Sequence, residues 1–120
     1  MKLRHALAFL IMSTSTLLAD APVRHVVSFK FKQGTSQKAI QEIETSFAEL
    51  KSKITQIQAL EWGTNVSSEN LDKGFTHMWV LTFNDAAALK VYLDHPAHKA
   101  FVQLLKPSLE DAFVIDFQPK

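Results

Sequence analysis

Four stretches of the chain alternate apolar and polar residues, as strands of a half-buried sheet do. The first, residues 24–32 (RHVVSFKFK), places His25, Val27, Phe29 and Phe31 on one face. Residues 57–66, 75–83 and 111–118 continue this alternation, with Leu60, Trp62 and Thr64 on one side of the second stretch. The chain therefore predicts four strands.

Three stretches have helical spacing instead. Residues Ile40, Ile43, Phe47, Leu50 and Ile54 recur as on one face of a helix of about 18 residues. Thr35 or Ser36 would cap it, and Glu42, Glu44, Glu49 and Lys51 would lie elsewhere on its surface. Residues 84–95 predict a second helix, capped by Asn84 or Asp85, and residues 96–106 a third that begins at Pro96, where no amide hydrogen is needed.

The resulting order, β-α-β-β-α-α-β, is that of an α+β, ferredoxin-like split βαβ fold. In that fold helices cover one face of a four-stranded antiparallel sheet. We expect the helices to pack on the face that collects Phe29, Phe31, Trp79, Leu81, Phe83, Phe113, Ile115 and Phe117. The opposite face would carry Val26, Met78, Val80 and Val114 among Lys30, Thr82 and Asp116. A partly apolar sheet surface favours association, so we predict a homodimer through this face.

Residues 1–19 do not fit this domain. A basic start, a short apolar run and small residues before residue 20 are typical of a secretory signal peptide. Cleavage after Ala19 is preferred to cleavage after Ala21, because the latter places Pro22 just after the scissile bond. An uncleaved anchor is the alternative, but the run is shorter than the roughly 20 residues of a membrane span. We expect an exported protein, periplasmic or secreted, with residues 20–120 as one domain and no membrane segment after cleavage.

Charge and cysteine content exclude several functions. Loss of Lys2 and Arg4 with the leader leaves 11 basic against 12 acidic residues, and neither sign forms a block that would bind nucleic acid. The chain has no cysteine, which excludes disulfides, a thiolate nucleophile and cysteine-ligated zinc.

Four motifs in order carry a family resemblance: the first strand VRHVVSFKFK, then EWG, GFTH and YLDHPAHKAF. Over residues 23–118 the chain resembles the stress-responsive α/β-barrel domain (Dabb) family, which includes a plant polyketide cyclase and heat-stable stress proteins. The resemblance implies a dimeric α/β barrel, with two ferredoxin-like sheets face to face.

The resemblance also implies site residues. In the cyclase of this family a tyrosine and the second histidine of HPAH carry the chemistry, and these match Tyr92 and His98. Two pocket histidines match His25 and His77, and a pocket tyrosine of the cyclase matches Phe47, a departure that implies a different substrate. Some members hold magnesium after the first helix, but the sequence KITQI there differs from the family pattern, so no metal or other cofactor is expected.

The residues themselves leave alternatives open for each histidine. In the first turn of a helix His98 would stay neutral, as a general base must, but it could equally cap or pack at a helix junction. His25 and His77 lie on the apolar face, where they could line a pocket or be hydrogen-bonded core residues. They stand near the starts of antiparallel strands, so spacing alone does not bring them together. His95 would cap the last helix, and Phe29 and Trp79 would serve either the core or an apolar pocket.

Two functions therefore stay open. One is an exported protein that binds or transforms a small carbonyl or aromatic compound. As an enzyme it would be a cofactor-independent cyclase or lyase in which Tyr92 and His98 abstract a proton beside a carbonyl and close a ring by an aldol-type step. Its pocket would be lined by His25, His77, Phe47, Phe29 and Trp79. The other is a non-catalytic dimeric stress-associated protein. A third possibility, a ferredoxin-like oxygenase, is disfavoured by the HPAH element.

Overall fold

The computed structural model describes residues 21–120 and confirms the predicted element order. The predicted signal peptide, residues 1–19, lies outside the described residues. The order of elements is β1 (Val23–Phe31), α2 (Gln37–Lys53), β2 (Ala59–Thr64), β3 (His77–Phe83), α3 (Ala86–Asp94), α4 (Pro96–Leu105), a 3-10 turn (Lys106–Ser108) and β4 (Leu109–Phe117).

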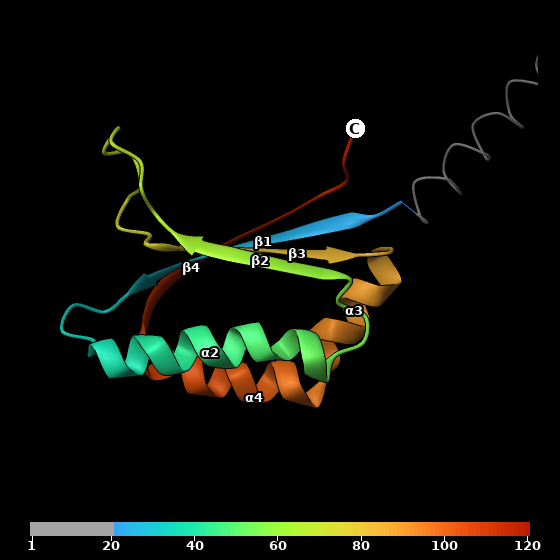
Figure 1. The fold of residues 1–120 in the computed structure, drawn as a ribbon, viewed down its shortest axis with the longest axis horizontal. Helices are drawn as coiled ribbons and strands as arrows, with labels where there is room; N and C mark the ends of the chain where they lie inside the picture. The colour runs from blue at the N-terminus through green and yellow to red at the C-terminus, as the bar shows by residue number, and fades with distance from the viewer. Residues whose placement is uncertain (1–20) are drawn as a thin grey trace, which may run out of the picture.

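The strands form one antiparallel sheet in the order β2-β3-β1-β4, the ferredoxin-like topology. Helices α2, α3 and α4 lie against one face of this sheet and leave the other face open (Figure 1). The register pairs Val27 of β1 with Trp79 of β3, and Trp79 with Trp62 of β2. Directly opposed side chains point to the same face, so these three residues mark the face under the helices.

The face assignment predicted for β4 is wrong. Val27 pairs with Val114, and His25 pairs with Asp116, so Val114 and Asp116 lie on the helix side. Phe113, Ile115 and Phe117 consequently lie on the open face, the reverse of the expectation. Apolar residues occupy both parities of this strand, so alternation alone could not orient it. β4 is an edge strand that the helices do not cover, and Phe113 and Val114 on its two faces are both about half exposed, at 50% and 51%.

Local signals explain where the helices begin. The Ser36 hydroxyl accepts a hydrogen bond from the Ala39 amide at 3.1 Å, and the Asp85 carboxylate accepts one from the Ala88 amide at 2.8 Å. From α2, Ile43, Phe47 and Leu50 are buried against the sheet, as the helical spacing predicts. No helix among residues 21–120 combines the length and apolar character needed to cross a membrane.

Candidate functional site

The junction between α3 and α4 fixes the position of His98. The His95 ring Nδ1 accepts a hydrogen bond from the Ala97 amide at 3.0 Å, which caps α4 as predicted, and Pro96 occupies the first helical position. His98 therefore lies in the first turn of α4, beside the end of α3. The helix junction positions one histidine as a cap and directs the second toward Tyr92.

Tyr92 and His98 lie against each other, with ring centroids 4.5 Å apart. His98 Nδ1 lies 3.1 Å from the Leu93 carbonyl oxygen, which can only accept, so Nδ1 carries the proton. In the neutral ring Nε2 is then an unprotonated acceptor. The Tyr92 side chain is buried, and its ring lies between those of His98 and His25. A phenol beside an imidazole with one unprotonated nitrogen is a potential acid–base pair.

The local environment sets the protonation of both groups. Burial lowers the pKa of His98 below its ordinary value, and nearby His25 lowers it further, against the raising effect of the hydrogen bond to Leu93. The direction agrees with the expected neutral ring, although burial is the largest cause. Burial also raises the pKa of Tyr92 well above its ordinary value of 10.0, so the phenol keeps its proton.

His25 joins this pair from β1. Its ring centroid is 5.7 Å from that of Tyr92, and its Nδ1 donates to the Asp116 carboxylate at 2.5 Å. Asp116 was expected on the open face among residues of the dimer surface. The inverted β4 places it on the helix side, where it fixes the orientation of the His25 ring. This pairing depends on the register between β1 and β4, which cannot be read from the local sequence of either strand.

Three other predicted pocket residues, Phe29, Phe47 and Trp79, form a separate aromatic group. Phe47 stacks on Trp79 at 4.1 Å between ring centroids, and Phe29 lies 5.8 Å from Phe47. Within residues 21–120 no ring contact joins this group to Tyr92 or His98. The Trp79 indole N–H is buried with no acceptor in the described part of the chain, which leaves a donor to which a ligand or water can bind.

His77 lies at the other end of the sheet. It pairs with Phe29, whereas His25 pairs with Leu81, so four residues of β1 separate the two histidines. At a rise of roughly 3.4 Å per residue they are about 14 Å apart along the strand direction. His77 Nε2 lies 2.7 Å from a Glu44 carboxylate oxygen of α2. Glu44 was expected on the helix surface. It is next to Ile43 and three residues before Phe47, both of which are buried, so its side chain lies at the edge of the core.

No group of three or more His, Asp or Glu side chains within residues 21–120 has the arrangement of a metal site. The structure brings three of the seven predicted site residues, Tyr92, His98 and His25, into one cluster. Asp116 completes it.

A ferredoxin-like α+β protein with a Tyr–His pair at the α3–α4 junction is therefore the class that the structure defines. The sequence matches the family model of the stress responsive A/B barrel domain over residues 23–119. The chain belongs to this family.

Several relatives extend the match. The stress-response A/B barrel domain-containing protein HS1 of Arabidopsis thaliana is 40% identical over 101 residues, 84% of this chain and 93% of HS1. Olivetolic acid cyclase of Cannabis sativa is 26% identical over 98 residues, 82% of this chain and 97% of the cyclase. The structure of a hydroxynitrile lyase from Passiflora edulis superposes with a TM-score of 0.79 at 26% identity, over 84% of this chain and 95% of the lyase.

A more distant structural neighbour shows the same fold. A ferredoxin-like protein of Bacteroides fragilis, itself described as dimeric, superposes with a TM-score of 0.67 at 24% identity, over 82% of this chain and 96% of that protein.

Proposed function

We propose that the protein is a cofactor-independent acid–base catalyst that makes or breaks a carbon–carbon bond beside a carbonyl group. The observation that carries the proposal is the contact between the rings of Tyr92 and His98, whose Nδ1 is bonded to the Leu93 carbonyl oxygen, so that Nε2 is the unprotonated nitrogen of the neutral ring. The lowered pKa of His98 keeps the ring in the form a base requires.

Each residue has a distinct part in the reaction. His98 Nε2 removes a proton from the carbon next to the carbonyl, and the electron pair forms an enolate. The Tyr92 hydroxyl donates a hydrogen bond to the developing oxyanion, and its raised pKa keeps it a donor rather than a competing anion. The enolate carbon then attacks a second carbonyl of the same molecule, and the protonated His98 returns its proton to the new alkoxide. Asp116 positions His25, which borders the same space.

Relatives with a similar fold support this class of chemistry. One is named a cyclase and one a hydroxynitrile lyase, and both names describe carbon–carbon bond changes beside an oxygen-bearing carbon. Phe47 is buried against Trp79 and offers no hydroxyl where the family resemblance implies a tyrosine. We therefore expect the substrate of this protein to differ from that of the cyclase.

Exchange of carbon-bound protons tests the base directly. The protein is incubated in D₂O with a panel of β-keto and aryl ketone compounds, and deuterium uptake is followed by NMR. We expect uptake with at least one compound, reduced about 100-fold or more by His98→Ala and substantially by Tyr92→Phe. The matched control is His95→Asn, which keeps a capping side chain on the same helix and should retain full uptake.

If a folded His98→Ala variant still catalysed deuterium uptake, His98 would not be the base, and the proposal would be wrong. Absence of uptake with every compound, together with no shift of the His98 ring signals, would favour the alternative of a non-catalytic dimeric stress-associated protein.

We also propose that the protein is a homodimer through its open sheet face. With β4 placed correctly, this face carries Val26, Met78 and Val80 together with Phe113, Ile115 and Phe117 in place of Val114. Met78, Phe113, Ile115 and Phe117 are each 46–50% exposed, an apolar surface that association would cover. The dimeric description of a structural neighbour supports the same assembly.

A further inference from the structure

A second chain of hydrogen bonds lies at the far end of the sheet from Tyr92. The Thr76 hydroxyl lies 2.8 Å from His77 Nδ1, and His77 Nε2 lies 2.7 Å from Glu44 Oε2. A carboxylate only accepts, so Nε2 carries a proton, and in the neutral ring Nδ1 accepts from the threonine hydroxyl. The order of groups is thus hydroxyl, imidazole, carboxylate.

The imidazole is the most buried of these three groups. Thr76 is exposed, His77 is 6% exposed, and the Glu44 side chain is 22% exposed. Phe31 and Trp62 flank the imidazole, with ring centroids 5.1 and 6.1 Å away. An accessible hydroxyl backed by a buried imidazole and a carboxylate is the arrangement that activates a nucleophile in hydrolases.

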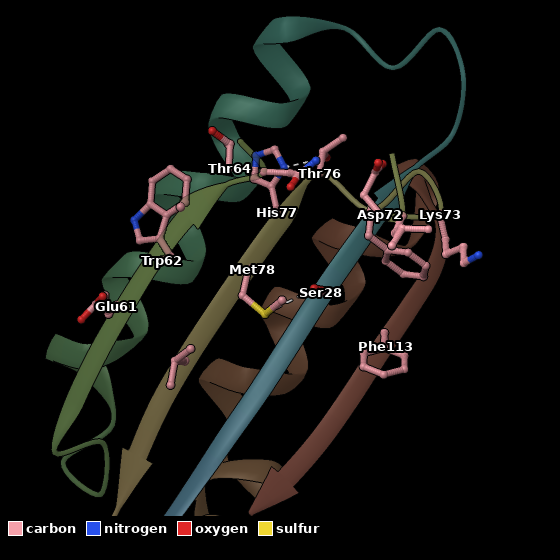
Figure 2. Close-up of a pocket in the computed structure, with 15 residues that line it drawn as sticks. Ser28, Glu61, Trp62, Thr64, Asp72, Lys73, Thr76, His77, Met78 and Phe113 are labelled. Carbon is pink, nitrogen blue, oxygen red and sulfur yellow. Dashed lines mark hydrogen bonds between the residues drawn. The ribbon is translucent and has the colours of Figure 1, made fainter. Parts of the chain in front are cut away.

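A cavity of about 540 Å³ has Thr76 among its lining residues. Thr76 and His77 line one end of it, and Met78 and Phe113 line its floor (Figure 2). Asn65 also lines the cavity. Its backbone N–H donates to the Thr76 backbone carbonyl oxygen at 2.8 Å, so the two residues are neighbours at the ends of their strands. The Asn65 side-chain oxygen accepts from the Ser67 amide at 3.0 Å, so its NH₂ group remains available as a donor.

We propose that Thr76, His77 and Glu44 form a second active site, which transfers acyl groups from small esters. The Thr76 oxygen attacks the ester carbonyl while His77 Nδ1 takes the hydroxyl proton, and the Asn65 NH₂ group donates to the oxyanion. The carbon–oxygen bond to the alcohol then breaks, and His77 gives its proton to the departing alkoxide. Water, deprotonated by the same imidazole, hydrolyses the acyl-threonine and restores the site. Glu44 orients the ring and stabilises the imidazolium.

This site is separate from Tyr92 and His98 and does not depend on their chemistry. In the homodimer proposed above, a partner sheet would lie over the cavity floor. Thr64, Asn65 and Thr76 are exposed at the end of the sheet, where an ester can enter.

Hydrolysis of p-nitrophenyl acetate by the full chain, with peptide mapping by mass spectrometry, tests the proposal. We expect an acetyl group on Thr76 and a turnover rate that falls about 100-fold or more in Thr76→Ala. Thr76→Ser should keep both signals, because it retains the hydroxyl. Glu44→Gln should lower the rate and change its pH profile, since the imidazolium loses its carboxylate.

The matched control is Thr45→Ala, the same substitution at an exposed position of α2 outside the cavity, which should leave the rate unchanged. Thermal unfolding of each variant shows whether it is folded. An acetyl group found on other residues but not on Thr76, or an undiminished rate in folded Thr76→Ala, would overturn the proposal.

Discussion

Truncation of Phe113 to alanine tests the open sheet face as the dimer surface. Phe113 is 50% exposed on this face. A phenylalanine buries roughly 200 Å² when fully covered, so about 100 Å² is available to a partner. At about 25 cal/mol per Å², covering it contributes about 2.5 kcal/mol, of which alanine would lose about 2. A two-fold dimer contains the residue twice, so the loss is about 4 kcal/mol.

That loss corresponds to an increase of about 1000-fold in the dimer dissociation constant. Sedimentation equilibrium over a dilution series measures it. The matched control is Leu104→Ala on α4, which removes a side chain that is 40% exposed on the helix layer. An unchanged dissociation constant for Phe113→Ala, or an equal increase for Leu104→Ala, would refute the assignment of the dimer to this face.

Three further predictions concern single residues. Phe47→Ala should lower the free energy of unfolding by about 3–5 kcal/mol in urea denaturation, because Phe47 is 2% exposed and stacks on Trp79; a loss below about 1 kcal/mol would contradict this packing. Because the pKa of His98 is lower in the folded chain, the neutral ring stabilises the fold above about pH 6.5, and this contribution is lost as the pH falls. In thermal unfolding, the stability of His98→Asn should therefore fall less steeply than that of the unmodified protein between about pH 7 and 5. An identical dependence of stability on pH in the two proteins would contradict this prediction. His95→Ala should cost about 0.5–2 kcal/mol in the same urea assay, whereas His95→Asn should cost little, and equal losses would argue against the cap.

Sequence patterns predict the orientation of a strand correctly where only one face of the strand is buried. β1 and β3 alternate cleanly, so Phe29 and Trp79 were placed correctly under the helices. β4 failed because Phe113 and Val114 are neighbours of equal apolarity on opposite faces. Its orientation depends on pairing with Val27 and on its place at the edge beyond the helices, and neither is written in its own residues.

The candidate site was predictable only in part for a similar reason. Tyr92 and His98 are close in sequence and meet across a short helix junction, so spacing brought them together. Antiparallel pairing correctly indicated that His25 and His77 would be apart. Their carboxylate partners, Asp116 and Glu44, are 91 and 33 residues away in the chain, and such contacts follow from tertiary register rather than from local pattern.

The most direct test of the account is the protonation of the His98 ring, read from its nitrogen and carbon-bound proton signals by NMR near pH 7. The account predicts a neutral ring with the proton on Nδ1, and an Nε2 signal that shifts when a carbonyl compound binds. A protonated ring, or a neutral ring with the proton on Nε2, would show that His98 Nε2 cannot act as the base and would contradict the proposed chemistry.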